Sequence, residues 1–241
     1  MATTYSVNIT MSSATVSALI ANQYQLFGFK AADGPASGVP VVWFATSNYS
    51  TQSTISWQEQ YAGYTSTTTN LAPNTQILAS FSAPMNLGQT MNVGAGGVGT
   101  VVNTGSPGYL NIYNQTTTPY TCGVSVFNQV TNSANPICAF NLFGGGLDTF
   151  VPVEIIYLMF ATQAVNTGTV IEQAFAPGIQ VNMTGQSTPA PLTFDINNGW
   201  TGPGYSTNYP ANQNLLPLLI NPGGAEAVSV RAATRFRLAL L

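Results

Sequence analysis

Amide, hydroxyl and aromatic side chains occur together at two places in the sequence. Sugars present hydroxyl groups that amides and hydroxyls can bond, and C–H faces that stack on tryptophan or tyrosine. These residue types therefore predict sites for a neutral carbohydrate, whereas a turn anchored by asparagine is the alternative interpretation. The candidate ligand-binding residues are Asn197, Asn198, Trp200 and Tyr205 in one set and Asn86, Gln89 and Thr90 in the other.

Two carboxylates, Glu59 and Glu172, lie in segments of similar composition. Brought together, they could serve as the carboxylate pair of a glycosidase. A structural role is the simpler interpretation, because three arginines alternate along the end of the chain and a strand would place them on one face. We therefore expect structural ion pairs among Glu59, Glu172, Arg231, Arg235 and Arg237.

Other catalytic chemistry finds little support in the sequence. The chain has no histidine, which removes the commonest general base and the usual serine, cysteine and metal mechanisms. Its glycine clusters lack the lysine and hydroxyl residue of a phosphate-binding loop. Cys122 and Cys138 are too few for a zinc site and are predicted to be buried free thiols, with a disulfide as the alternative. We expect no enzyme activity, no metal and no cofactor.

The composition limits the partners of the chain. Only 5% of the residues are charged, the net charge is −3, and residues 60–147 contain no charged side chain. Four basic residues cannot form the positive surface that nucleic acid requires. Because a nearly neutral surface favours association, we expect a homo-oligomer. The expected partners are a neutral glycan or further copies of the chain.

No segment has the features of a signal peptide or a transmembrane helix. The first residues lack a basic region followed by a long apolar run, and the most apolar stretch, residues 155–161, is too short to cross a bilayer. The sequence therefore predicts a chain without a transmembrane segment. We expect it in the cytoplasm, or released without a conventional signal peptide.

Three short motifs recur in the same order and predict a tandem duplication. The outer two keep an equal spacing in both copies, and the period is far longer than that of solenoid repeats. We predict one unit over residues 1–104 and a second over residues 105–241, with a Pro/Gly-rich loop and a final strand over 227–240. The motifs are Leu26-Phe27-Gly28, Val39-Pro40-Val41 and Phe44-Ala45-Thr46, repeated as Leu142-Phe143-Gly144, Val151-Pro152-Val153 and Phe160-Ala161-Thr162.

Short runs rich in β-branched and aromatic residues, separated by Gly, Pro, Asn and Ser, predict strands along most of the chain. Residues 14–21 are the one early helix candidate. The predicted fold is all-β: two related β-sandwich units packed about a pseudo-twofold axis, with little helix.

Together these features predict a non-enzymatic binding protein that recognises neutral carbohydrate as a lectin does. A self-assembling structural protein, such as a filament, sheath or crystalline inclusion, is the first alternative, because weak charge lets copies pack closely. A pore-forming toxin is a further alternative, in which the Ser/Thr-rich residues 46–70 would become a membrane hairpin.

Overall fold

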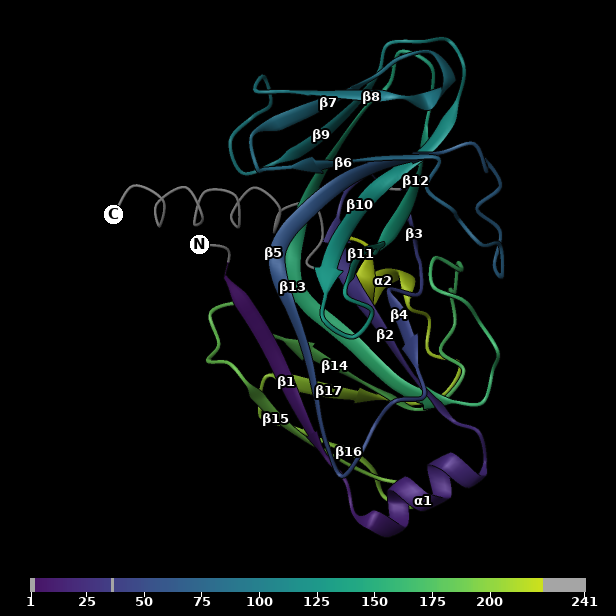
Figure 1. Cartoon of the computed structure of the whole chain (residues 1–241), viewed down its shortest axis with the longest axis vertical. Helices are drawn as coiled ribbons and strands as arrows, with labels where there is room; N and C mark the ends of the chain where they lie inside the picture. The colour runs from purple at the N-terminus through teal and green to yellow at the C-terminus, as the bar shows by residue number, and fades with distance from the viewer. Residues whose placement is uncertain (1–2, 36, 223–241) are drawn as a thin grey trace.

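The computed structural model describes residues 3–35 and 37–222, and these residues form mainly β-strands arranged in two sheets. The all-β fold class is confirmed. Two 15-residue strands, one in each sheet, run along the length of the molecule (Figure 1). They are β5 (Gln52–Ser66) and β13 (Leu147–Ala161).

The first sheet has the strand order β16-β15-β1-β5-β10-β12-β3, with β6 added on β5 and β11 on β10. Its β1–β15 ladder is parallel, and the other pairs are antiparallel. The strands other than β5 are β1 (Thr4–Thr10), β3 (Val39–Pro40), β6 (Phe81–Met85), β10 (Tyr120–Asn128), β11 (Ser133–Pro136), β12 (Cys138–Leu142), β15 (Ala190–Asp195) and β16 (Gly199–Thr201).

The second sheet has the order β17-β14-β13-β9-β7-β8, and β2 pairs with both β13 and β4. Its β7–β9 ladder is parallel. The strands other than β13 are β2 (Gln25–Asp33), β4 (Phe44–Thr46), β7 (Gln89–Val93), β8 (Gly99–Val102), β9 (Leu110–Asn114), β14 (Gly178–Asn182) and β17 (Ser206–Tyr209).

Helices are few in the described part of the chain. The predicted early helix is confirmed as α1 (Ser13–Ala21), which begins where the Ser12 hydroxyl accepts a bond from the Thr15 amide. A second helix, α2 (Leu216–Leu219), and a 3-10 turn, η1 (Ala95–Gly97), are one turn each. No helix among the described residues is long and apolar enough to cross a membrane.

Two segments do not form the strands that their composition predicts. The sequence favours strands over residues 75–81 and 168–175, but these residues form isolated bridges and loops, although β6 begins at Phe81. Their backbone groups bond to each other across the two segments, as from the Ile77 amide to the Gly168 carbonyl at 2.9 Å. The predicted final strand over 227–240 lies outside the described residues.

Strands from both predicted units take part in both sheets. In the first sheet β1 lies between β5 and β15, and in the second β13 pairs with β2 and β9. The repeated motifs also occupy different surroundings: Phe44–Thr46 is the short strand β4, whereas Phe160 and Ala161 end the long strand β13. The tandem duplication and the division at residue 104 stay predictions.

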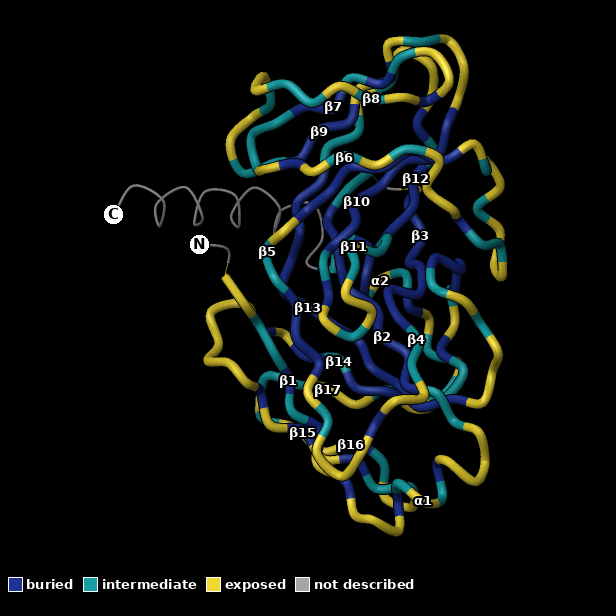
Figure 2. The backbone as a smooth tube through the Cα atoms, in the orientation of Figure 1, coloured by how far each residue is buried: buried dark blue, intermediate teal, exposed yellow. Residues whose placement is uncertain are grey.

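The main hydrophobic core contains buried side chains from both sheets. Ile9, Trp57 and Val126 come from the first sheet, and Leu158 and Val181 come from the second. Buried backbone follows β5, β10, β13 and β2 through the middle of the molecule, while the exposed residues concentrate in the loops (Figure 2). The long strands β5 and β13 therefore form the centre of the structure.

A buried ion pair joins β2 and β13 beside an irregularity in their pairing. The register shifts between Pro152 and Ile156, where proline can donate no ladder hydrogen bond. The Lys30 Nζ donates to the Val153 carbonyl at 2.8 Å and lies 2.7 Å from Glu154 Oε2. Trp57 of the other sheet donates its indole N–H to the same carboxylate oxygen at 2.8 Å. This cluster, Lys30-Trp57-Glu154, links the two sheets through polar contacts.

Candidate functional site

Asn197 and Asn198 form the turn between β15 and β16. Asp195 Oδ1 accepts bonds at 3.0 Å from the Asn197 amide, the Asn198 amide and the Asn198 side chain. These backbone bonds, together with the Thr15 hydroxyl on Oδ2, hold the pKa of Asp195 below its usual value. The Asn198 side chain therefore takes part in a turn anchored by Asp195.

Trp200 belongs to the hydrophobic core. Its side chain is 5% exposed, lies stacked on Phe160 at 5.5 Å between ring centroids, and is tilted against Phe194 at 4.7 Å. Tyr205, half-buried, packs against the same core, and its carbonyl accepts a bond from the Asn182 amide. The buried Trp200 ring therefore has no open face for a sugar to stack on.

The second predicted set lies in the turn between β6 and β7 and at the start of β7. Gln89 Oε1 accepts a bond from the Asn86 amide at 2.7 Å, and Gln89 Nε2 donates to Asn103 at 2.7 Å. Thr90 lies beside a shallow pocket of about 310 Å³ that also contains Asn111 and Tyr113. This turn lies near the β7 end of the molecule and the first set near the β16 end, so the structure does not bring the two sets together (Figure 1).

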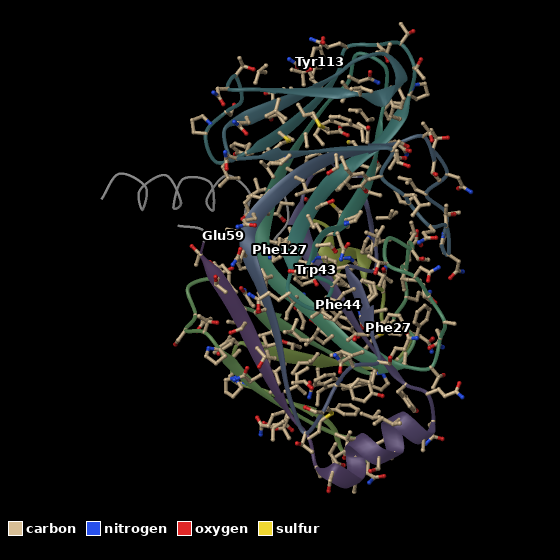
Figure 3. All side chains as sticks on the ribbon, viewed as in Figure 1. Phe27, Trp43, Phe44, Glu59, Tyr113 and Phe127 are labelled. Atoms are coloured by element: carbon tan, nitrogen blue, oxygen red, sulfur yellow. The ribbon has the colours of Figure 1, made fainter. Side chains whose placement is uncertain are left out.

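The two predicted glutamates also lie in different places. Glu59 is half-buried on β5, where its Oε1 accepts a bond from the Tyr5 hydroxyl at 3.3 Å; Figure 3 shows it beside that strand. Glu172 lies in the loop between β13 and β14. Arg231, Arg235 and Arg237 lie outside the described residues, so the predicted ion pairs with them stay predictions.

Sequence reasoning missed the Lys30–Glu154 pair, although the signal for it was present. Each residue is the single charge within a long apolar run, residues 26–32 and 149–161. A charge inside a fully buried strand needs an opposite charge, because burying it alone is very costly. The scarcity of charge elsewhere made these two residues each other's natural partners.

Glu172 lines an open surface cavity of about 460 Å³. Three segments distant in the sequence surround it, and the backbone joins them: the Asn74 amide donates to the Val170 carbonyl at 2.8 Å and the Asn212 amide to the Ala174 carbonyl at 2.8 Å. Both asparagines have positive φ, 68° and 63°, a conformation that asparagine tolerates well. The polar and aromatic residues of this Glu172 cavity are Asn74, Gln163, Glu172, Gln173, Phe175 and Asn212.

The polar side chains of the Glu172 cavity are free to bind a ligand. Within residues 3–35 and 37–222, none of these side chains makes a hydrogen bond. They are Asn74, Gln163, Glu172, Gln173 and Asn212. Amides offer both donors and acceptors, and an ionised carboxylate offers strong acceptors. The cavity therefore presents a mixed hydrogen-bonding surface with the Phe175 ring at its side.

Among the described residues that line the Glu172 cavity, Glu172 is the one carboxylate, and Glu59 is not one of them. Glycosidases of the common type need two carboxyl groups on either side of the bond that breaks. In the described part of the chain no group of three or more His, Cys, Asp and Glu side chains is placed to hold a metal ion.

Cys122 and Cys138 are both buried and free, which confirms the predicted thiols. The Cys122 thiol donates to Asp148 Oδ2 at 3.1 Å. Burial raises the pKa of Cys122 well above its usual value, with the Asp148 charge adding to the effect, and raises the pKa of Cys138 to about 12. Both sulfurs therefore stay protonated and shielded at neutral pH.

We expect the native protein to resist thiol reagents at pH 8, whereas the chain unfolded in urea reacts at both cysteines, because the thiolate is the reactive form. Titration with a chromogenic disulfide reagent measures this, and rapid labelling of the native chain would contradict it.

The raised pKa values of the two cysteines also imply that the free energy of unfolding falls as the pH rises from about 9 towards 12, because in that range the thiols of the unfolded chain ionise more readily than those of the folded chain.

Searches against family models, curated proteins and solved structures gave no match to this chain.

Proposed function

We propose that the protein binds a neutral carbohydrate in the Glu172 cavity, as a lectin does, and catalyses no reaction there. The observation that carries the proposal is the cavity itself, a volume of about 460 Å³ whose lining includes one glutamate, four exposed amide residues and a phenylalanine. This volume lies within the range of about 300–1,000 Å³ typical of small-molecule sites.

Each group has a role that suits a sugar. The Glu172 carboxylate accepts hydrogen bonds from two neighbouring hydroxyls, and the amides of Asn74 and Asn212 donate to ring or hydroxyl oxygens. Phe175 offers an apolar face to sugar C–H groups. Its ring packs edge-on against the ring of Phe27, with 6.1 Å between the two ring centroids. A neutral polyol suits this set better than an anion, because no described residue that lines the cavity is a cation.

The scaffold we propose is a β-sandwich in which related units share the two sheets. Its support is the main core, which draws buried residues from both sheets, and the polar cluster Lys30-Trp57-Glu154 that links them. In such a scaffold the two sheets support the loops that line the cavity, since binding loops are commonly carried by a rigid scaffold. A ligand then meets a preformed site, which lowers the entropy cost of binding.

A glycan array probed with the full chain tests the function, and we expect binding to at least one neutral glycan. Glu172→Gln keeps the shape of the side chain but removes its charge, so affinity for that glycan should fall about tenfold to a hundredfold. Glu59→Gln is the matched control, because Glu59 is a half-buried glutamate outside the cavity. The proposal fails if no neutral glycan binds, or if both variants bind as the parent does.

A further inference from the structure

Four exposed hydrophobic side chains gather where three loops meet at one end of the second sheet. Tyr113 of β9 lies directly opposite Leu147 of β13, and Phe143 precedes Leu147 across a tight glycine turn. Val98 closes the neighbouring turn between β7 and β8, and β7 pairs with β9. These side chains are 56% (Val98), 37% (Tyr113), 66% (Phe143) and 58% (Leu147) exposed. We call residues 94–98, 113–118 and 143–147 the tip. Tyr113, which is labelled in Figure 3, marks its place at the end of the molecule formed by β7, β8 and β9.

The polar backbone of the tip is largely satisfied from within. The buried side chain of Asn114 donates to the carbonyls of Thr118 and Phe143 and accepts from the Thr116 amide. The Gly145 amide donates to the Thr116 carbonyl at 2.9 Å, and the Thr65 hydroxyl donates to the Gly97 carbonyl at 2.6 Å. Several polar groups of the tip are therefore paired within it, and its exposed residues include polar Gln115, Thr117 and Thr118 beside the four large apolar side chains. Such a cluster of exposed apolar side chains is typical of an interaction surface.

The tip also carries no charge. Every residue from 60 to 147 is uncharged, and the first charged side chain beyond the tip is Asp148. That carboxylate is partly buried and accepts the Cys122 thiol bond, and burial raises its pKa above the usual value. Moving the tip out of water therefore removes no exposed charge from solvent, which would otherwise be the largest cost.

We propose that the tip docks on the surface of an uncharged or zwitterionic lipid bilayer, with Phe143, Leu147 and Val98 inserted among the headgroups and Tyr113 at the boundary. Val98 and Phe143 project from separate turns and Leu147 and Tyr113 from adjoining strand ends, an uneven arrangement that suits a soft surface. Tyrosine favours the membrane–water boundary because its ring is apolar and its hydroxyl stays hydrated. Because backbone groups of the tip are paired with one another, they can enter the headgroup region without losing their hydrogen bonds. Without cations, the tip gains nothing from anionic lipid.

Sedimentation with phosphatidylcholine vesicles tests the proposal with the full chain and no glycan present, so its outcome is independent of the Glu172 cavity. We expect the parent to bind, with little dependence on salt. The double variant Phe143→Ser/Leu147→Ser should bind at least about tenfold more weakly, because two largely exposed apolar side chains no longer enter the bilayer. The matched control Ile20→Ser/Leu78→Ser changes exposed hydrophobic residues away from the tip, 58% and 62% exposed, and should bind as the parent does.

Three results would overturn the proposal. The parent could fail to bind phosphatidylcholine, it could bind only vesicles that contain anionic lipid, or the tip and control variants could bind equally. Light scattering of the same proteins identifies the competing occupant: a parent dimer that only the tip variant dissociates, without vesicle binding, would assign the tip to a second copy of the chain. Thermal unfolding of each variant verifies its fold, since all four substituted side chains are exposed.

Discussion

Lys30→Met is expected to lower the free energy of unfolding by about 3–5 kcal/mol, because it removes the Lys30 ammonium from beside the buried Glu154 carboxylate. The side chains of Lys30 and Glu154 are 0% and 2% exposed, and the Lys30 Nζ also satisfies the Val153 carbonyl at the register shift. Methionine fills a similar volume, so the loss reports charge and hydrogen bonding more than packing. Urea denaturation followed by circular dichroism measures the effect.

A double variant separates the ion pair from its surroundings. Lys30→Met/Glu154→Leu should lose less stability than the sum of the two single variants, since the second substitution removes the carboxylate that the first deprives of the Lys30 ammonium. Strictly additive losses would contradict a coupled pair. Lys30→Arg is a further control, because it keeps the positive charge. The Lys30 ammonium lies 5.5 Å from the centre of the Trp57 ring, and a planar guanidinium does not fit that position.

Trp200→Ala is expected to destabilise the fold by about 3–5 kcal/mol, which is typical of removing a large aromatic side chain from a core. The indole packs against both Phe160 and Phe194, so its removal leaves a cavity between β13, β15 and β16. Thermal or urea unfolding measures the loss.

Trp200→Phe is the matched control for that substitution. Within the described residues the buried Trp200 Nε1 has no hydrogen-bond partner, so phenylalanine keeps the aromatic contacts without breaking a bond. We expect it to cost less than half as much as alanine. Equal losses in the two variants would contradict the packing role, and an unchanged stability of Trp200→Ala would contradict the burial itself.

Local features of the fold could be predicted from the sequence. The helix over residues 14–21 and the strand Gly99–Val102 follow from hydroxyl capping and from β-branched residues between glycines. The full length of β5 and β13 could not be predicted in this way, because the ends of these strands contain polar residues or follow glycines. Pairing with distant strands extends them. Residues 168–175 have strand-like composition but meet loops rather than a continuous partner strand.

The candidate site was only partly accessible to sequence reasoning. Glu172 stood out as one of few carboxylates, but the other groups of its cavity come from residues 74, 163, 173, 175 and 212, which backbone bonds between loops bring together. Trp200 was recognisable as an aromatic beside asparagines, yet its residue type could not show which face of β16 it occupies. The register of that short strand, opposite Phe194, turns the ring towards the core.

The parallel ladder between β1 and β15 has a consequence for how the chain reaches this structure. Val7 lies opposite Ala190 and Thr10 opposite Thr193, so a strand near the start of the chain gains one of its neighbours only after most of the chain has been synthesised. Contacts between such distant residues require closure of a long loop and slow folding. During synthesis, one side of β1 therefore stays open as an unpaired edge, and a ribosome-bound fragment ending before β15 should depend on chaperones that cover such edges.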